Sequence, residues 1–264
     1  MKLLKGSELA GYIKERHARQ VRSLAAQGIY PKLAIVQAKD DPVINTYVRL
    51  KKQYGSDIGV DIEVHNPEQE RIAGLIGELN NDKSVHGIIV QLPLPDVSVT
   101  DEVVNMVAPQ KDVDALGNQA KFEPATPLAI MWLLSGYNIE LAGKKILLIG
   151  RGKLVGAPLE QILKKSGQDV EVIEDKGELT SHTKEADIII TATGSPAVLY
   201  PDMIKKGAVV VDAGVASESG KTVGDLSPEV YEREDLTITP EKGGVGPLTV
   251  CALFENVIRA ASKK

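Results

Sequence analysis

The sequence predicts an α/β protein of two domains: an N-terminal α/β substrate domain, and a Rossmann-type dinucleotide-binding domain with a parallel sheet. Three observations predict it. Helical and strand-like segments alternate along the chain, the alternation is interrupted near residues 115–127, and a second series then opens with an apolar strand that runs into a glycine loop. Such alternation is typical of βαβ units and hence of parallel sheets.

The first series gives the N-terminal domain. Short apolar runs predict buried strands, and apolar residues at helical spacing predict amphipathic helices. In chain order we expect a helix at 7–27, a strand at 31–38, a helix at 43–58, a strand at 60–66, a helix at 67–82 and a strand at 85–95. The segment "ALGNQAKFEPATP" (115–127) has the composition of a loop and is the candidate interdomain connection, and a helix follows it at 127–139.

The second series begins at "KKILLIG" (144–150) and continues with a helix from about residue 155. Further strand-like segments follow at 169–175, 186–194, 207–215 and 236–249, and a helix is expected at 247–262. The predicted domains are residues 1–118, completed by the C-terminal helix (247–264) packing back on them, and residues 119–246.

Composition excludes several classes of protein. A chain of 264 residues can form two modest cores, and a net charge of −5 gives no reason to expect nucleic acid as a partner. No apolar run approaches the roughly 20 residues of a membrane span, and no signal peptide is evident. The single cysteine, Cys251, fits a reducing cytosol, so we expect a cytoplasmic protein. The four histidines are scattered without a metal-binding motif, so we expect no metal.

The glycine loop "GRGKLVG" predicts a dinucleotide site. Gly150, Gly152 and Gly156 follow an apolar strand and open a helical pattern. Glycines there allow a tight turn and a close approach of the backbone to a pyrophosphate at the helix N-terminus. The spacing GxGxxxG is not the standard one, so a strand–helix turn without a ligand remains an alternative. A P-loop is excluded because no Gly-Lys-Ser/Thr follows.

The end of the next strand favours NAD over NADP. Glu174 and Asp175 lie about 24 residues after Gly150. An acidic side chain at this place accepts hydrogen bonds from the ribose 2′-hydroxyl and repels a 2′-phosphate. Arg151 favours NADP instead, because its side chain could pair with that phosphate.

The stretch "TYVRLKK" (46–52) puts Tyr47 and Lys51 one helical turn apart. It can be a solvated helix face, the Tyr-Lys pair of a short-chain dehydrogenase, or an acid/base lysine in an interdomain cleft. The second reading requires the glycine loop before the pair, and here the pair comes first. The third needs a neighbour that adjusts the lysine pKa from its ordinary ~10.4, and Gln91 on an apolar strand could orient it. Asp112 and Asp114 lie next to the interdomain connection, where ligand sites usually form.

Nine stretches, occurring in the same order, resemble the methylenetetrahydrofolate dehydrogenase/methenyltetrahydrofolate cyclohydrolase family over nearly the whole chain. They are "DDP" with "YVRLKK" (40–52), "LNNDKSVHGIIVQLPLP" (79–95), "KDVDA" (111–115), "PATP" (124–127), "GRGKLVGAP" (150–158), "ADIIITATGSP" (186–196), "VVDAGV" (210–215), "VGDL" (223–226) and "GGVGPLT" (243–249).

The resemblance implies oxidation of 5,10-methylenetetrahydrofolate with NAD or NADP, followed by hydrolysis of the methenyl product to 10-formyltetrahydrofolate. It implies that Lys51 is the acid/base, that Gln91 holds and tunes it, that Tyr47 stacks on the folate and that Asp114 binds the pterin. These four are the expected catalytic residues. The expected substrate-binding residues are Tyr47, Leu92, Pro93, Asp114, Gly244, Val245, Gly246 and Pro247. Cofactor binding is expected from Gly150, Arg151, Gly152, Val155, Gly156, Glu174, Asp175, Thr193 and Gly194. The family also implies a homodimer joined through the nucleotide-binding domains.

The chain departs from the family pattern at several positions: Ile44 replaces a common serine, Ala115 a usual glycine, Gly152 the serine of "GRS", and Glu241 and Lys242 the usual Val-Pro. Where many members have "CHS" after the second nucleotide strand, this chain has "VIED", which strengthens the NAD inference. Three alternatives stay open: a dehydrogenase without cyclohydrolase activity, a non-catalytic folate- or nucleotide-binding protein, and another NAD oxidoreductase resembling shikimate dehydrogenase.

Overall fold

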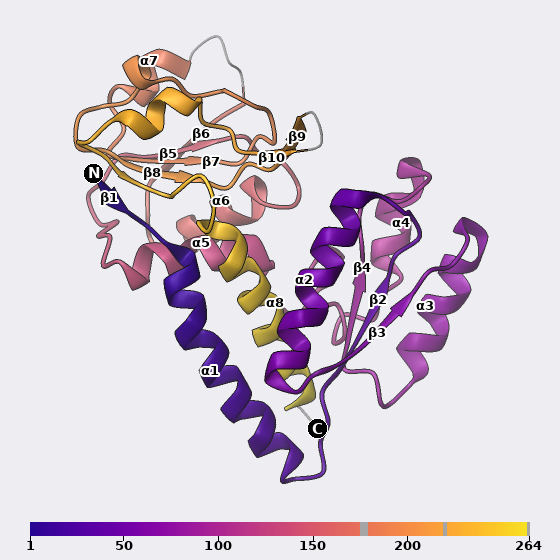
Figure 1. Cartoon of the computed structure of the whole chain (residues 1–264). Coiled ribbons are helices and arrows are strands. Elements are labelled where there is room, and N and C mark those ends of the chain that lie inside the picture. The colour runs from indigo at the N-terminus through magenta and orange to yellow at the C-terminus, as the bar shows by residue number, and fades with distance from the viewer. Residues whose placement is uncertain (175–178, 219–220, 263–264) are drawn as a thin grey trace. The chain divides into compact units, whose positions relative to one another are not determined.

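The computed structural model of the chain describes residues 1–174, 179–218 and 221–262. The chain forms two compact units, one made of residues 1–10 and 126–249 and the other of residues 11–125 and 250–264. Each unit contains a parallel sheet and helices (Figure 1), so the predicted two-domain α/β class is confirmed. Helices α1 (Gly6–Ala25) and α8 (Val245–Ala261) contribute residues to both units.

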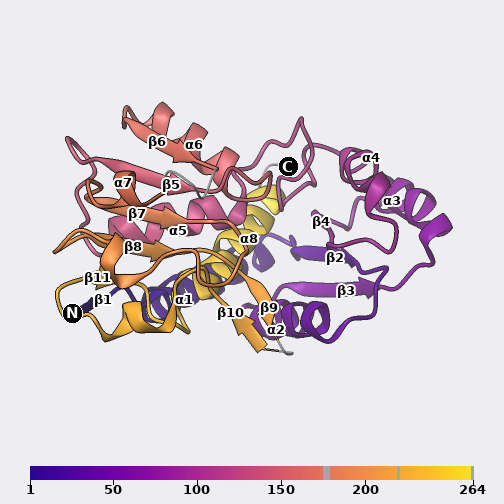
Figure 2. The same cartoon turned by 90° about the horizontal axis from the view of Figure 1, so that it is seen from above.

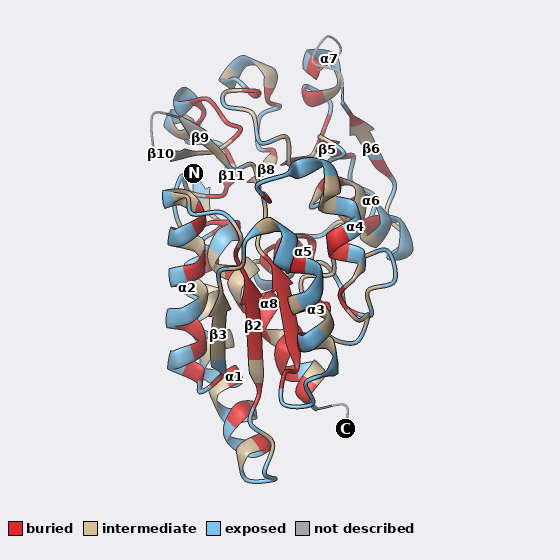
Figure 3. Cartoon of the chain, turned by 90° about the vertical axis from the view of Figure 1, so that its right-hand side faces the viewer, coloured by how far each residue is buried: buried red, intermediate tan, exposed pale blue. Residues whose placement is uncertain are grey.

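The unit of residues 11–125 and 250–264 contains a three-stranded parallel sheet in the order β3-β2-β4. The central strand β2 is buried along most of its length, whereas β3 at the edge is half-buried (Figure 3). Every second residue of β2 and β4 faces one apolar cluster with α3 and α4, as the alternation of side chains in a strand requires. The elements are β2 (Lys32–Val36), α2 (Pro42–Ile58), β3 (Asp61–His65), a 3₁₀ turn (Gln69–Arg71), α3 (Ile72–Asn81), β4 (Gly87–Val90), a 3₁₀ turn (Val97–Val99) and α4 (Thr100–Asn105).

Helix α2 carries the Tyr47–Lys51 pair, and local sequence sets both of its ends. The side chain of Asp41 caps the first turn by accepting from the backbone N–H groups of Val43 (2.9 Å) and Ile44 (3.3 Å). Pro42 occupies the first helical position, where its missing N–H costs nothing. Gly59 ends the helix in the left-handed conformation, with φ 84°.

The other unit contains a six-stranded parallel sheet in the order β1-β11-β8-β7-β5-β6, whose central strands lie side by side in Figure 2. Its core joins apolar residues of β5, β7 and β8 to those of the segments that cover them. The elements are β1 (Lys2–Leu3), α5 (Ala125–Gly136), β5 (Ile146–Ile149), α6 (Gly156–Lys165), β6 (Val170–Ile173), α7 (Leu179–Thr183), β7 (Ile188–Thr191), a 3₁₀ turn (Pro201–Met203), β8 (Val209–Asp212), a hairpin of β9 (Ala216–Glu218) and β10 (Lys221–Val223), a 3₁₀ turn (Pro228–Glu232) and β11 (Thr237–Ile238).

Several local features differ from the predicted elements: helix α4 was not predicted, and of the strand expected at 236–249 only β11 forms. Strand β1 and the β9–β10 hairpin are too short to give a periodic signal, and neither was predicted. The helix expected at 67–82 begins only at Ile72, because Glu68 is extended and a 3₁₀ turn intervenes. The last helix begins at Val245 rather than at residue 247, so Pro247 lies in its first turn, where proline is tolerated.

Candidate functional site

Lys51 is hydrogen-bonded to Gln91. Its Nζ donates to Gln91 Oε1 at 2.8 Å. Gln91 directly follows β4, and its backbone N–H donates to Val36 O at 2.9 Å, which fixes the end of the strand. Burial lowers the pKa of the Lys51 ammonium, and the negative charge of Asp114 opposes that shift. The structure therefore brings three of the predicted catalytic residues together around a lysine whose pKa is shifted towards neutrality.

The loop that carries Asp114 is built around the buried carboxylate of Asp112. Asp112 is 3% exposed and accepts from the backbone N–H groups of Leu116 (3.3 Å) and Gly117 (2.8 Å). Burial raises its pKa to about 6, and these two hydrogen bonds act in the other direction. Ala115 adopts φ 56°, the left-handed region that favours glycine. The turn that the family's usual glycine would make is thus kept by an alanine.

Tyr47 lies one turn before Lys51 on α2 and is half-buried. Burial raises the pKa of its hydroxyl, so that this group stays protonated at neutral pH. A tyrosine that exchanges protons in catalysis would need the opposite shift. This direction speaks against Tyr47 as the acid/base and leaves it as a residue that could contact a ligand. Ile44, on the preceding turn, is 4% exposed and belongs to the core. Leu92 is half-buried and Pro93, which follows it through a cis peptide bond, is exposed.

A cavity of about 280 Å³ lies at the carboxyl ends of β5, β6 and β7. Open parallel sheets bind their ligands at this edge. Five predicted cofactor residues line it, namely Gly150, Arg151, Gly152, Glu174 and Thr193. The other lining residues are Ile149, Ile173, Leu179, Ala192, Ser195 and Val198. Val155, Gly156 and Gly194 do not line it, and Asp175 lies outside the described residues.

Two of the three loop glycines are required by the backbone. Gly150 has φ 93°, and a Cβ atom there would lie 2.7 Å from Ala192 O. A Cβ atom on Gly156 would lie 2.1 Å from Gly150 O, so this glycine lets helix α6 start against the turn. Gly152 has open space around its Cα, which agrees with the serine that the family usually has here. The loop geometry therefore depends on Gly150 and Gly156.

The predicted substrate-binding segment 244–247, which includes the first turn of α8, is held by the N-terminal residues of its own unit. Ser7 N donates to Gly243 O at 3.0 Å, and a Cβ atom on Gly6 would lie 2.0 Å from Gly244 O. Gly244 and Val245 are buried, Pro247 is half-buried and Gly246 is exposed. The two departures from the family pattern, Glu241 and Lys242, are exposed beside this segment.

Two family models cover the chain. The description of the first is tetrahydrofolate dehydrogenase/cyclohydrolase, catalytic domain, and it matches residues 4–114. The second is the NAD(P)-binding domain of the same family and matches residues 124–264. The chain belongs to the tetrahydrofolate dehydrogenase/cyclohydrolase family. The resemblance seen in its motifs is confirmed.

Named relatives of this family agree along the full length. The bifunctional protein FolD of Campylobacter jejuni is 39% identical over 280 aligned positions, covering 100% of this chain and 99% of the relative. A crystal structure of FolD from the same species has a TM-score of 0.92 at 38% identity and covers 99% of both chains. The Trypanosoma brucei enzyme, solved with NADP and an inhibitor, has a TM-score of 0.91 at 28% identity and covers 99% of this chain and 97% of its own.

Two aspartates that support the cavity at the carboxyl ends of β5, β6 and β7 were not among the predicted site residues, and one of them is buried and the other half-buried. Asp225 is fully buried and accepts from the N–H groups of Thr193 (2.7 Å) and Ser195 (3.2 Å). Asp225 N in turn donates to both carboxylate oxygens of Asp212 at 3.1 Å. A Cβ atom on Gly214 would lie 1.9 Å from Asp225 Oδ1. The sequence shows only that each acid is near a glycine, Asp212 two residues before Gly214 and Asp225 directly after Gly224, and this does not indicate the contact.

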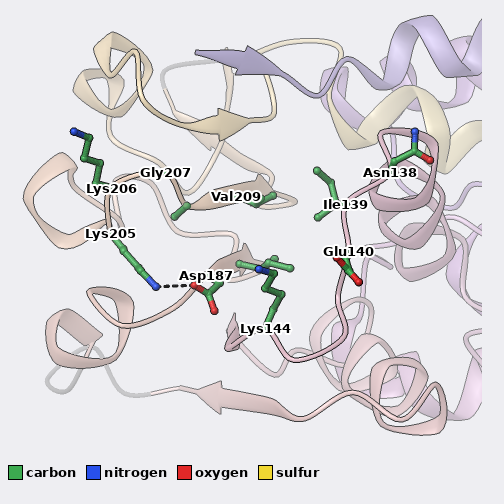
Figure 4. A pocket seen from close by; sticks show the side chains of 11 residues that line it. Asn138, Ile139, Glu140, Lys144, Asp187, Lys205, Lys206, Gly207 and Val209 are labelled. Carbon is green, nitrogen blue, oxygen red and sulfur yellow. Dashed lines mark hydrogen bonds and ion pairs between the residues drawn. The ribbon is translucent and has the colours of Figure 1, made fainter.

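A second cavity, of about 310 Å³, lies at the amino ends of β5, β7 and β8 (Figure 4). Its lining includes the charged residues Glu140, Lys144, Asp187, Lys205 and Lys206, and Lys205 Nζ is paired with Asp187 Oδ1 at 2.6 Å. Ligands of open parallel sheets bind at the opposite edge, so we assign no function to this cavity. The described residues (1–174, 179–218, 221–262) contain no group of three metal-ligating side chains and no helix long and apolar enough to cross a membrane.

Proposed function

We propose that this protein is a bifunctional enzyme of one-carbon metabolism that converts 5,10-methylenetetrahydrofolate to the methenyl and then to the 10-formyl derivative. Membership in the tetrahydrofolate dehydrogenase/cyclohydrolase family supports both steps. The observation that carries the assignment of residues is the 2.8 Å hydrogen bond from Lys51 Nζ to Gln91 Oε1. NAD(P)⁺, when bound, supplies the acceptor for the hydride that leaves the methylene carbon.

Lys51 is the proposed acid/base of the hydrolytic step. The lowered pKa of Lys51 increases the share of its neutral form, which takes a proton on Nζ from the water that adds to the methenyl carbon. The same Nζ then returns the proton to the ring nitrogen when the carbon–nitrogen bond breaks, and the hydroxyl proton of the adduct leaves to solvent. Gln91 orients Nζ without adding charge, because an amide oxygen accepts a hydrogen bond in either protonation state of the lysine.

The remaining substrate contacts are proposed by position. Tyr47 is the platform for the aromatic part of the folate, since a rigid half-buried ring offers apolar area at low entropic cost. Asp114 binds the pterin, whose N–H groups suit a carboxylate acceptor. Leu92, Pro93 and residues 244–247 complete the proposed set of substrate-binding residues. We also propose that 1–118, completed by 247–264, form the folate-binding part and 119–246 the NAD(P)-binding part.

The cavity residues fit a dinucleotide. A left-handed Gly150 and a Gly156 without room for a Cβ atom let the backbone approach a pyrophosphate at the N-terminus of α6. Glu174, which follows β6 and lines the cavity, suits a ribose 2′-hydroxyl, so we propose that NAD is preferred to NADP. The ratio of kcat/KM with NAD⁺ and NADP⁺ tests this preference, and a strong preference for NADP⁺ would overturn it.

The residue assignment is tested by Lys51→Met, assayed separately in the two steps. We expect hydrolysis of methenyltetrahydrofolate to be lost and the dehydrogenase step to be reduced. Wild-type protein that oxidises the methylene substrate but does not hydrolyse the methenyl one would instead support the dehydrogenase-only alternative. If Lys51→Met leaves hydrolysis unchanged, Lys51 is not the acid/base.

We further propose that the protein is cytoplasmic, in line with its single cysteine, and that it forms a homodimer, in line with the family resemblance. Sedimentation of the purified protein would test the homodimer.

A further inference from the structure

Arg151, on the loop that lines the nucleotide cavity, is held by a nearly buried carboxylate. Its Nε donates to Glu160 Oε2 at 2.7 Å. The other carboxylate oxygen, Glu160 Oε1, accepts from Lys164 Nζ, also at 2.7 Å. The Glu160 side chain is only 10% exposed, whereas those of Arg151 and Lys164 are 53% and 57% exposed. Glu160 is therefore the fixed centre of this cluster, with a cation bound to each oxygen.

Helix α6 determines where this carboxylate lies. Glu160 and Lys164 are four residues apart, as are Gly156 and Glu160, so all three share one face of the helix. Gly156 packs against Gly150 O at the start of this face. Glu160 is thus placed one helical turn beyond the glycine turn from which Arg151 projects. The tight Gly150–Gly156 contact brings the guanidinium within reach of Glu160.

Among the described residues, the guanidinium is grouped with two carboxylates and a second cation. The hydrogen bond and charge of Glu160, and to a smaller extent the charge of Glu174, raise the pKa of Arg151. Two carboxylates and two cations, Arg151 and Lys164, sum to zero. A 2′-phosphate brings roughly −1.5 to −2 charges and pairs best with an arginine that is free to donate two parallel hydrogen bonds. Here the Nε–H is already donated to Glu160.

We propose that Glu160 determines the coenzyme choice of this enzyme, by pairing its charge with the guanidinium that would otherwise bind the 2′-phosphate of NADP. An arginine close to the acidic residue at the end of the second strand is what lets a dinucleotide fold accept that phosphate. Arg151 follows β5, the first strand of this series, but lines the same cavity as Glu174 at the end of β6, and its guanidinium is paired with Glu160. The inference rests on the proposed nucleotide site and on its proposed preference for NAD.

The test is equilibrium binding of two nucleotides that differ only in the 2′-phosphate, adenosine 5′-monophosphate and adenosine 2′,5′-bisphosphate, followed by NAD⁺ and NADP⁺. Wild-type protein is compared with Glu160→Gln, which keeps the size of the side chain and removes its charge, and with Glu160→Ala. Glu185→Gln is the matched control, because it removes a 70% exposed carboxylate that is paired with Lys145 in the same unit. The double variant Glu160→Gln/Arg151→Gln shows whether any gain acts through Arg151.

We expect the 2′-phosphate to bind more favourably in Glu160→Gln, by roughly ten- to a hundredfold relative to wild type, the factor that one charge-assisted hydrogen bond contributes. Glu185→Gln should show no such gain, and the double variant should lose it. A wild type that prefers the monophosphate, with a ratio unchanged in both Glu160 variants, overturns the role of Glu160 and leaves the NAD preference standing. A wild type that prefers the bisphosphate overturns the NAD preference as well. Absence of all nucleotide binding overturns the site itself.

Discussion

Replacing Gln91 by glutamate tests whether a neutral partner keeps Lys51 able to exchange protons. The substitution changes no atom count and puts a negative charge 2.8 Å from Lys51 Nζ. At that distance the Coulomb attraction is about 1.5 kcal/mol in water and at most about 6 kcal/mol at an effective dielectric constant of 20. Opposite charges this close usually shift a pKa by about 1–3 units. We expect the pKa of Lys51 to rise by that amount.

The consequence is a loss of neutral Lys51 at physiological pH. Below the pKa the neutral fraction falls about tenfold for each unit, so hydrolysis of methenyltetrahydrofolate should slow by roughly ten- to a thousandfold. Because the base must be neutral, the rising limb of the pH–rate profile should move to higher pH by the same 1–3 units. Hydride transfer, which takes no proton from Lys51 in the mechanism proposed above, should fall less.

The assay follows methenyl absorbance from about pH 6 to pH 10 after subtraction of the uncatalysed hydrolysis. Gln53→Glu is the control, since it adds the same charge to the exposed part of α2, two residues from Lys51. A Gln91→Glu enzyme whose rate at neutral pH and whose rising limb both match wild type would refute the argument. So would an equal shift in Gln53→Glu, because the effect would then be one of net charge.

Three further predictions concern stability, each measured by urea denaturation. Ala115 has a left-handed backbone with φ 56°, so Ala115→Gly should raise the free energy of unfolding by up to about 1 kcal/mol. The control is Ala73→Gly on the exposed part of α3, which should lower the free energy of unfolding by about 0.5–1 kcal/mol. Equal losses of stability in the two variants would contradict this prediction. Tyr54→Phe removes a hydroxyl that lies 2.9 Å from Nδ1 of the fully buried His17, and the free energy of unfolding should fall by about 1–3 kcal/mol. A loss below about 0.5 kcal/mol would show that water takes the place of the hydroxyl. Burial raises the pKa of Asp112 to about 6 from 3.8, so between those values the folded chain holds a proton that the unfolded chain has lost. Stability should therefore fall by about 2–3 kcal/mol as pH rises through that window, and Asp112→Asn should lack this slope.

The sequence predicted the local parts of both sites because their signals are local. The strand–glycine–helix order at Gly150 and the helical spacing of Tyr47 and Lys51 each follow from residues that are close in the chain. The supports escaped prediction because they are long-range. Asp225 contacts Thr193 and Ser195 only because two loops at the edge of the sheet come together in the fold. The sequence around "VGDL" does not predict that contact.

Ala115 illustrates the same limit in the backbone. An alanine in place of the family's usual glycine is unfavourable at positive φ, which is costly for any residue with a Cβ atom. The structure keeps positive φ all the same, since Asp112 binds the N–H groups of Leu116 and Gly117 just beyond it. Two hydrogen bonds to a buried carboxylate outweigh about 1 kcal/mol of local strain. Such a balance cannot be read from a single residue type.

The two cations in these sites have opposite partners, and the difference explains their roles. Lys51 is hydrogen-bonded to a neutral amide, which adds no negative charge to oppose the lowering of its pKa by burial; only the charge of Asp114 acts against that shift. Arg151 is bound to a carboxylate and keeps its charge at any pH at which the protein is folded. A lysine with a neutral partner can transfer a proton, whereas an arginine with an ionic partner acts only through its fixed charge and its hydrogen bonds. It follows that exchanging the two kinds of partner, by Gln91→Glu in one unit and Glu160→Gln in the other, should impair proton transfer in the first case and relax coenzyme selection in the second.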